Sequence, residues 1–367
     1  MTNVIRRTAR LPMMIGAAVA VSGMLWGGGA AYALTAAEIA NLKGPERQNI
    51  LVAGARKEGK VTWYSAMIIN QALRPLANAF QKKYPFIKLD YWRGSSRKIL
   101  QKVLAEIRAK ALVADVIEGS GLAQPMVKAG AVQPFHSPSL AAYPEKYRDP
   151  KRLWAASRFS YMGMAYNTKL ISPSEAPKTY QDLLDPKWKG KMAWRAASES
   201  GALLFITNLR LTMGEAKAEA YLQKLKGQKI VNFSGSARTL VNRVVEGEYP
   251  IALNIFLHHP IISAAKGAPS AARPLEPVPS LNGTIMLPKG VKHPHAAMLL
   301  IDFVLSEEGQ RVLKKANYLP AHPKVDPKSS LKPIVPRLAG LKENFVTPEV
   351  LFDNREKSKA LFNKYFR

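Results

Sequence analysis

The chain has 367 residues, of which 47% are hydrophobic, and its 54 lysines and arginines exceed its 26 acidic residues, giving a formal net charge of +28. This length exceeds one ordinary core and predicts two lobes of about 100–200 residues each. The chain has no cysteine, which excludes disulfides, thiolate metal sites, a cysteine nucleophile and a lipidated-cysteine anchor.

The first 33 residues have the pattern of a cleaved signal peptide. Arg6, Arg7 and Arg10 precede an uncharged run over 11–31, which ends in Ala31-Tyr32-Ala33. A basic head, an apolar stretch and a small-x-small end are what a signal peptidase recognises. We expect cleavage after Ala33 and export to a bacterial periplasm, with the Sec and twin-arginine routes both open. A membrane anchor is the alternative, which the proline and glycines of the run disfavour.

The excess of positive charge has three interpretations. A positive field attracts anions and speeds their capture, it would also suit nucleic acid, and it is otherwise only a solvated surface. The lysines and arginines are spread along the chain, without an arginine-rich block or an aromatic-interleaved motif. This distribution argues against nucleic acid as a partner and favours a small anion.

The first half of the exported chain alternates predicted helices and strands. A helical segment over 36–57 precedes strands at 61–65, 86–92 and 115–117, and amphipathic helices marked by Leu73–Phe80 and Ile99–Ile107 connect the strands. Apolar residues at helical spacing define the helices, and alternation of period two defines the second strand. Such an alternation predicts an α/β fold with mostly parallel sheets covered by helices.

Serine-rich turns follow the three strands of this half. Ligands of parallel sheets lie beyond the carboxyl ends of the strands, and turns that open helices present free backbone N–H groups to anions. Each serine alone would be explained by capping of its own helix, but three such ends on one rim favour a site. The residues are Ser65, Arg93, Ser95, Ser96 and Ser120.

The second half begins with a strand over 157–167 that is predicted to cross into a second lobe. It continues with a strand over 191–195, a turn that opens a helix, a helix over 238–246, a strand over 251–256 ending in Leu257-His258-His259, a Pro- and Ala-rich return over 269–279 and a strand over 284–287. One long helix over 295–316 and a basic tail with a final helix near 347–365 complete the prediction.

Several segments, in this order, resemble periplasmic solute-binding proteins of ABC importers, specifically the group of ferric-iron-binding proteins. They include Val61–Ser65, Ala114–Val116, Tyr166–Leu170, Leu183–Gly190, Gly247-Glu248 and Ser306–Gln310. The resemblance runs from about Val61 to Pro323. It implies a type II periplasmic-binding-protein fold, with two α/β lobes that each have a mostly parallel sheet, joined by crossing strands at 160–165 and 277–284 and closing like a hinged clamp.

This resemblance sets the expected domain boundaries. After the signal peptide at 1–33, residues 34–160 and 279–320 form the first lobe, and residues 161–278 form the second. The tail, residues 321–367, is expected to pack on the second lobe.

The resemblance also guides the expected ligand. The adjacent tyrosines that bind iron in the ferric relatives correspond to Leu257 and His258. Because leucine cannot bind iron, the ferric site of those relatives is expected to be missing, and we predict no metal and no cofactor. The turn that carries an anion in the relatives matches Ser200-Gly201-Ala202.

Arginine supports an anion at this turn, because its planar guanidinium pairs with a carboxylate or phosphate at two points. Arg195, at a strand end beside the turn, is the strongest candidate, with Arg93 and Arg158 in support. Tyr161, at the crossing, and His258 complete the predicted pocket. The expected ligand is an organic carboxylate or a phosphate ester.

Consecutive histidines at a strand end would point to opposite sides, so we do not expect His258 and His259 to share a metal. The sequence has no Gly-x-Ser-x-Gly elbow, His-Glu-x-x-His motif or Walker loop, and we expect no enzyme. The prediction is a monomeric binding protein that delivers a small anion to an inner-membrane ABC permease. Presentation to a sensor, ferric binding by Tyr161, Glu118 and His258, and an exported hydrolase are the alternatives.

Overall fold

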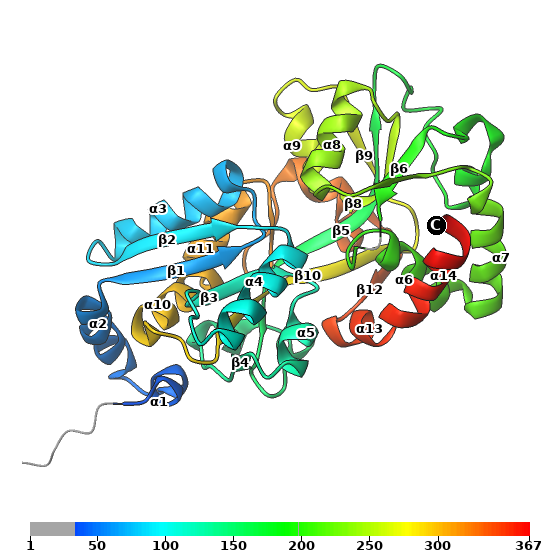
Figure 1. The fold of residues 1–367 in the computed structure, drawn as a ribbon. Helices are drawn as coiled ribbons and strands as arrows, with labels where there is room; N and C mark the ends of the chain where they lie inside the picture. Colours follow the sequence, from blue (N-terminus) through cyan, green and yellow to red (C-terminus); the bar gives the residue numbers. More distant parts are fainter. Residues whose placement is uncertain (1–33, 197) are drawn as a thin grey trace, which may run out of the picture. The chain divides into compact units, whose positions relative to one another are not determined.

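The computed structural model describes residues 34–196 and 198–367 (Figure 1). The predicted signal peptide, residues 1–33, lies outside the described residues. Among the residues described, no helix has the length and apolarity that crossing a bilayer requires. The described chain folds around two sets of strands and their cores, which we call lobe 1 and lobe 2.

Lobe 1 is built on three parallel strands, β1 (Lys60–Ser65), β2 (Lys88–Arg93) and β3 (Val116–Ser120), in the order β2-β1-β3. Alternate residues of β1 enter different cores, as the two-residue repeat of a strand requires. Trp63 packs into the core under the helices α1, α2, α3 and α10, whereas Tyr64 packs into the core under α4 and α5. Both faces of the sheet are therefore covered, as predicted for an α/β lobe.

The remaining elements of lobe 1 cover this sheet or extend its edge (Figure 1). Their bounds are α1 (Ala36–Asn41), α2 (Arg47–Glu58), the π-helical η1 (Ile69–Leu73), α3 (Arg74–Lys83), α4 (Ser96–Arg108), α5 (Ala123–Lys128), β4 (Val132–Gln133), η2 (Pro138–Ala142), η3 (Glu145–Tyr147), α10 (Pro294–Leu305), α11 (Glu307–Lys315) and β11 (Leu319–Pro320).

Two long antiparallel strands connect the lobes. The first part of β5 (Ala155–Asn167) pairs with β10 (Val278–Pro288) over residues 155–161. The second part, residues 162–167, pairs with strands of lobe 2. Because β5 belongs to both sheets, its middle at Tyr161 and Met162 is the structural junction between the lobes, within the crossing that the sequence predicts over 160–165.

Lobe 2 has the same layered design. Trp194 and Leu253 face a core under α6 and α7, whereas the neighbouring Ala193 and Ala252 face a core under α8. Its elements are η4 (Gln181–Leu184), η5 (Pro186–Trp188), β6 (Met192–Arg195), α6 (Ala202–Met213), α7 (Glu215–Lys226), β7 (Val231–Phe233), α8 (Ala237–Glu246), β8 (Ile251–Phe256), α9 (His258–Ala264) and β9 (Ser270–Arg273).

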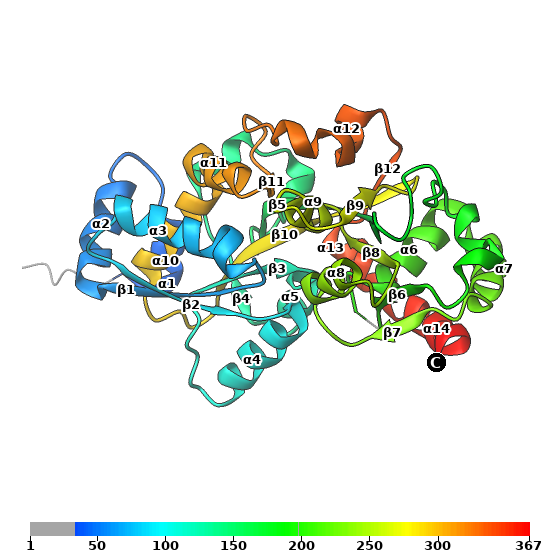
Figure 2. The same ribbon diagram turned by 90° about the horizontal axis from the view of Figure 1, so that it is seen from above.

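The C-terminal tail contacts both lobes (Figure 2). It contains η6 (Ser329–Ile334), α12 (Pro336–Ala339), β12 (Glu343–Phe345), α13 (Pro348–Asp353) and α14 (Arg355–Phe366). Helix α14 packs on α6 and α7, but α13 packs on α5 of lobe 1, where Gln124 Nε2 donates to Glu349 Oε1 at 2.7 Å. The predicted packing on lobe 2 thus describes only part of the tail.

Two predicted helices are each two helices in the structure. The segment over 295–316 is interrupted at Ser306, whose hydroxyl accepts from the backbone N–H of Gly309 at 3.2 Å and caps α11. This is an N-cap signal that the continuous apolar pattern hides. The segment over 347–365 is likewise divided at Asn354 into α13 and α14. The sequence analysis also missed α7 and the short strands β7 and β9.

Phe362 tests how strongly the tail stabilises lobe 2. It is 1% exposed in the lobe 2 core, with its ring centroid 6.0 Å from that of Trp194. We expect Phe362→Ala to lower the free energy of unfolding by about 3–5 kcal/mol in urea titrations. Leu338→Ala, at a tail position that is 40% exposed, is the control and changes it by less than about 0.5 kcal/mol. Equal effects of the two variants would contradict the packing of the tail.

Candidate ligand-binding site

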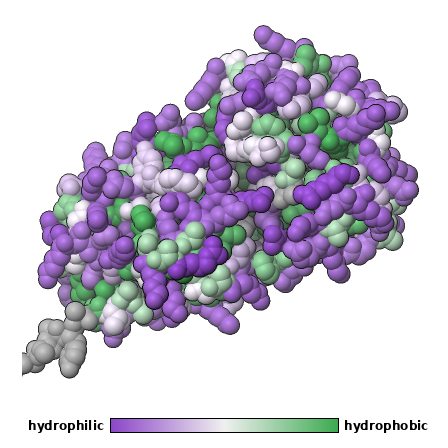
Figure 3. Space-filling view, viewed as in Figure 1, coloured by the Kyte–Doolittle hydropathy of each residue, from purple (hydrophilic) through white to green (hydrophobic). Residues whose placement is uncertain are grey.

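A cavity of about 650 Å³ lies between the lobes and is lined by residues of both. Lobe 1 contributes the ends of β2 and β3 and the start of α4, lobe 2 contributes the turns before α6, α8 and α9, and the tail contributes α14. We call this cavity the interlobe cleft. Eight residues predicted from the sequence line it: Arg93, Ser95, Ser96, Ser120, Arg158, Arg195, Ser200 and His258. Hydrophilic residues cover most of the face of the molecule that Figure 3 shows.

Four predicted residues do not line the cleft. Ser65 is fully buried and donates through Oγ to Glu118 Oε2 at 2.7 Å. Tyr161 packs in an apolar cluster with Leu257 and other residues, because its position in β5 turns it away from the cleft. Gly201 and Ala202 follow Ser200 in the sequence; Gly201 is the N-cap of α6 and Ala202 is its first residue. Their contribution is to shape the turn rather than to line the cavity.

On the lobe 1 side, a buried ion pair fixes Arg158 in the wall. Its Nε donates to Glu118 Oε1 at 3.0 Å, and its Nη1 donates to Ser160 Oγ at 3.1 Å. A Cβ atom at Gly283, on the neighbouring β10, would come within 2.8 Å of that carboxylate oxygen and 2.9 Å of the arginine side chain. Only glycine leaves room for this pair. Since Glu118 balances Arg158, this arginine brings little free charge to the cleft.

On the lobe 2 side, Arg195 has no such balance. Its Nη2 donates to the carbonyl oxygen of Ser200 at 2.5 Å and to Ser200 Oγ at 2.6 Å, whereas its Nε has no hydrogen-bond partner. No carboxylate oxygen of the described residues lies within 4 Å of its guanidinium nitrogens. Burial lowers the pKa of Arg195 to about 10, so the guanidinium remains charged at neutral pH. A buried charge without a counter-charge is costly, and an anion in the cleft would relieve that cost.

The turn beside Arg195, at Ser200 and Gly201, is held in place by a residue of β8. Asn254, on β8, donates through Nδ2 to the carbonyl oxygen of Gly201 at 2.7 Å. Asn254 has a φ of 47°, in the left-handed region that asparagine tolerates better than most residues. A Cβ at Gly201 would lie 2.7 Å from the carbonyl oxygen of Arg195. The close approach of this turn to β6 therefore requires glycine and sets the position of Ser200.

The histidine pair differs from its prediction. His258 and His259 open α9 rather than extending a strand, and their ring centroids are 4.6 Å apart. The prediction that they point to opposite sides is wrong, because consecutive residues at a helix start are only about 100° apart. Both are almost fully buried, and neither ring nitrogen of His258 nor Nδ1 of His259 has a hydrogen-bond partner.

Burial and the nearby Arg158 and Arg238 keep both histidines neutral. Desolvation lowers the pKa of His258 to about 3, and it lowers the pKa of His259 well below its ordinary value. A neutral imidazole presents one donor and one acceptor. Tyr318, with its ring centroid 4.8 Å from that of His258, supports this ring from the lobe 1 side. The pair thus offers polar atoms to a ligand without adding charge.

The sequence analysis missed several residues of the cleft, namely Arg238, His259 as a member of the pair, Tyr318 and three cations of the tail. Arg238 follows the turn Ser234-Gly235-Ser236 before α8, which is the same serine-rich signal that identifies the lobe 1 turns. It could have been found by that rule. The cations of the tail, Arg355, Lys359 and Arg367, could not, because only tertiary packing brings α14 to the cleft.

The tyrosine pair of the ferric relatives is replaced in this chain by Leu257 and His258. Leu257, at the first position of the expected tyrosine pair, is fully buried in an apolar cluster. Among the described residues, no three His, Asp or Glu side chains gather to hold a metal ion. Arg158 and Arg238 act on His258 with positive charge, which opposes a cation at this position. The alternative ligand set is not assembled either, because Glu118 is bound to Arg158 and Tyr161 lies in another cluster.

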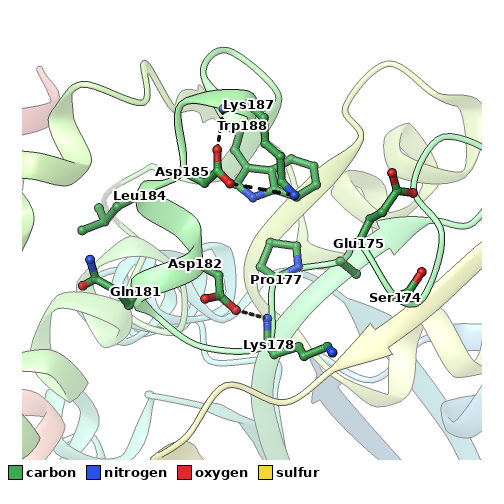
Figure 4. Close-up of a pocket in the computed structure, with 11 residues that line it drawn as sticks. Ser174, Glu175, Pro177, Lys178, Gln181, Asp182, Leu184, Asp185, Lys187 and Trp188 are labelled. Atoms are coloured by element: carbon green, nitrogen blue, oxygen red, sulfur yellow. Dashed lines mark hydrogen bonds and ion pairs between the residues drawn. The ribbon is translucent and has the colours of Figure 1, made fainter.

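A second hollow, of about 580 Å³, lies along residues 174–188 of lobe 2 (Figure 4). Its two aspartates are used within the segment: Asp182 accepts from the backbone N–H of Lys178 at 2.8 Å, and Asp185 accepts from that of Lys187 at 2.9 Å. These are turn-stabilising bonds. With its carboxylates so engaged and all of its walls from one segment, this hollow is a weaker candidate than the interlobe cleft.

Comparison with known proteins places this geometry in a family. Residues 112–335 match a family described as bacterial extracellular solute-binding protein, which is more than half of the chain. The chain belongs to this family. The sequence prediction of a solute-binding protein that resembles the ferric-binding group is confirmed.

Three known proteins show what this solute-binding protein is similar to. Iron uptake protein A1 of Synechocystis is 25% identical over 246 residues, which are 63% of this chain and 68% of that protein. The periplasmic binding protein AfuA of Actinobacillus pleuropneumoniae, with fructose-6-phosphate bound, has a TM-score of 0.72 and 24% identity, over 84% of this chain and 98% of AfuA. Iron-bound HitA of Pseudomonas aeruginosa has a TM-score of 0.70 and 23% identity, over 84% and 99%. The fold is that of type II periplasmic binding proteins, as predicted.

The buried histidines predict a pH dependence of stability. In the unfolded chain they take up protons below their ordinary pKa of 6.5, whereas in the folded solute-binding protein they stay neutral to about pH 3 for His258. The free energy of unfolding therefore decreases as the pH falls from 6.5, by about 1.4 kcal/mol per pH unit for each histidine. We expect His258→Gln to make this decrease shallower by about that amount between pH 6 and 4.5 in urea titrations. The same slope in both proteins would show that His258 titrates normally.

Proposed function

We propose that this solute-binding protein is the periplasmic component of an ABC-type importer and that its interlobe cleft captures a small organic anion, a carboxylate or a phosphate ester. One observation carries the proposal. A buried arginine without a carboxylate partner, Arg195, lies in the same cavity as polar atoms that have no partner on Ser120, His258 and His259. Buried polar atoms are usually satisfied, so their convergence favours a polar, negatively charged ligand.

The charge of the cleft favours an organic anion over iron. Eight arginines and lysines line the cavity, but Glu199 is the one acidic residue among its lining residues. Coulomb attraction in a partly buried site is several times stronger than in water, and such a cleft also concentrates anions and speeds their capture. The AfuA complex supports a phosphate ester, whereas HitA supports iron. Since the same fold accommodates a phosphate ester in one protein and iron in another, we base the choice of ligand on the side chains of this cleft.

The fold suits capture without chemistry. The lobes meet at the middle of β5 and at β10, so a small change of backbone angles there would close the walls over a ligand. Arg195 would hold the anion from lobe 2, and Ser120 and the start of α4 would meet it from lobe 1. The closed protein would then release its ligand unchanged to an inner-membrane permease, as a monomer and without a catalytic step. Export of the chain by its signal peptide belongs to this proposal.

Arg195 gives the test. We expect Arg195→Gln to weaken the binding of a phosphate monoester such as glycerol 3-phosphate by about 10–150-fold in isothermal titration calorimetry, because a hydrogen bond to a charged group contributes about 1.5–3 kcal/mol. The matched control is Arg243→Gln on the surface of the same lobe, where Arg243 pairs with Glu246 at 3.0 Å.

The control variant should retain the affinity of the wild-type protein within about threefold. The proposal fails if the wild-type protein binds neither phosphate esters nor carboxylates, or if it binds ferric citrate and none of these anions. Equal affinities of the Arg195 and Arg243 variants would remove Arg195 from the site.

A further inference from the structure

Four of the eight cations that line the interlobe cleft form two groups, one on each lobe. Arg195 and Arg238 belong to lobe 2, whereas Arg93 and Arg97 belong to lobe 1, at the end of β2 and the first turn of α4. All four line the same cavity. A single small anion at the Arg195–Ser200 turn would be met by the first group and would leave the second group with its charge unbalanced.

None of these four arginines has a carboxylate within ion-pair distance in the part of the chain that the structure describes. Two other arginines of the cleft differ in this respect, since Arg158 pairs with Glu118 and Arg355 pairs with Glu199 at 2.7 Å. Arg238 donates only to neutral oxygens, the carbonyl of His259 at 3.1 Å and Ser263 Oγ at 2.7 Å. The distribution of acidic residues thus leaves positive charge on both walls.

The Arg93 wall has further features that suit an anion. Ser95 and Ser96 line the cleft beside Arg93 and Arg97, and α4, which is 13 residues long, begins there. Ser120 Oγ, at the end of the adjacent β3, is buried and has no partner. The cavity volume of about 650 Å³ exceeds what one inorganic phosphate needs and is in the range of sites for small organic molecules.

We propose that the cleft is built for a ligand with two separated anionic groups, such as a phosphorylated carboxylic acid, one group held by Arg195 and Ser200 and the other by Arg93 and Arg97. This inference rests on the proposed function. Such a ligand would also favour closure of the lobes. Two positive walls repel each other, and a ligand with a negative group at each end neutralises both walls and joins them, whereas a ligand with one anionic group neutralises only one.

The test compares 3-phosphoglycerate, which has a phosphate and a carboxylate, with glycerol 3-phosphate, which lacks the carboxylate, by isothermal titration calorimetry on the mature protein. We expect 3-phosphoglycerate to bind at least about tenfold more tightly. The double variant Arg93→Gln, Arg97→Gln should lose this advantage, so that it binds the two ligands with affinities that agree within about threefold. Arg93→Lys with Arg97→Lys should restore part of it, and Lys98→Gln, at an exposed position of α4 outside the cleft, should leave it unchanged.

Each outcome separates the inference from the proposed function. Equal affinities of the wild-type protein for the two ligands would overturn the second anionic subsite and leave the capture of a single anion intact. An advantage that persists in the double glutamine variant would overturn the assignment to Arg93 and Arg97. If neither ligand binds and inorganic phosphate and simple carboxylates do not bind either, the proposed function fails, and the inference fails with it.

Discussion

A buried positive charge without a negative partner is the constraint on which the cleft depends. Arg195 is 8% exposed, and the protein satisfies it only with the carbonyl and hydroxyl oxygens of Ser200. A protein that needed this arginine only for stability would pair it with a carboxylate, as the same chain does for Arg158 with Glu118. The fold instead holds the unpaired guanidinium in position with glycine and asparagine, at Gly201 and Asn254. Under the proposed function, an anion bound in the cleft would recover the stability lost in this way.

The architecture places this charge where a ligand can reach it. Strand β5 pairs with β10 of lobe 1 and with β8 of lobe 2, so each lobe keeps its own core while their loops face each other across one cavity. The parallel strands of lobe 1 end at the cleft, as the general rule for ligand sites in α/β sheets requires. The tail adds a third contribution, because α13 contacts lobe 1 and α14 contacts lobe 2. Motion between the lobes must therefore also change contacts of the tail.

The sequence was sufficient for the parts of the fold that local patterns determine. Val61 and Trp63 alternate with polar or oppositely facing neighbours, and the turns at Ser95 and Ser200 carry the residues that start helices, so strands and helix starts were predicted correctly. The patterns failed where packing decides. The break at Ser306 interrupts an apolar repeat that continues across it. Only Leu257, a residue type that does not signal a turn, separates the strand that ends at Phe256 from the helix that begins at His258.

The same distinction applies to the site. Residues at strand ends and helix starts could be predicted, because a parallel sheet brings such positions together whatever their distance in the sequence. Tyr161 was placed in the pocket because it lies at the crossing, but alternation along β5 turns it into an apolar cluster. Arg355 and Lys359 reach the cleft only because α14 packs on α6 and α7, and no spacing in the sequence indicates that contact.

The most direct measurement is the crystal structure of residues 34–367 grown with millimolar glycerol 3-phosphate. We predict phosphate oxygens within hydrogen-bond distance of Arg195, with His258 or Ser120 as a further hydrogen-bond partner. An empty cleft, or a phosphate bound elsewhere while Arg195 contacts only Ser200, would contradict it.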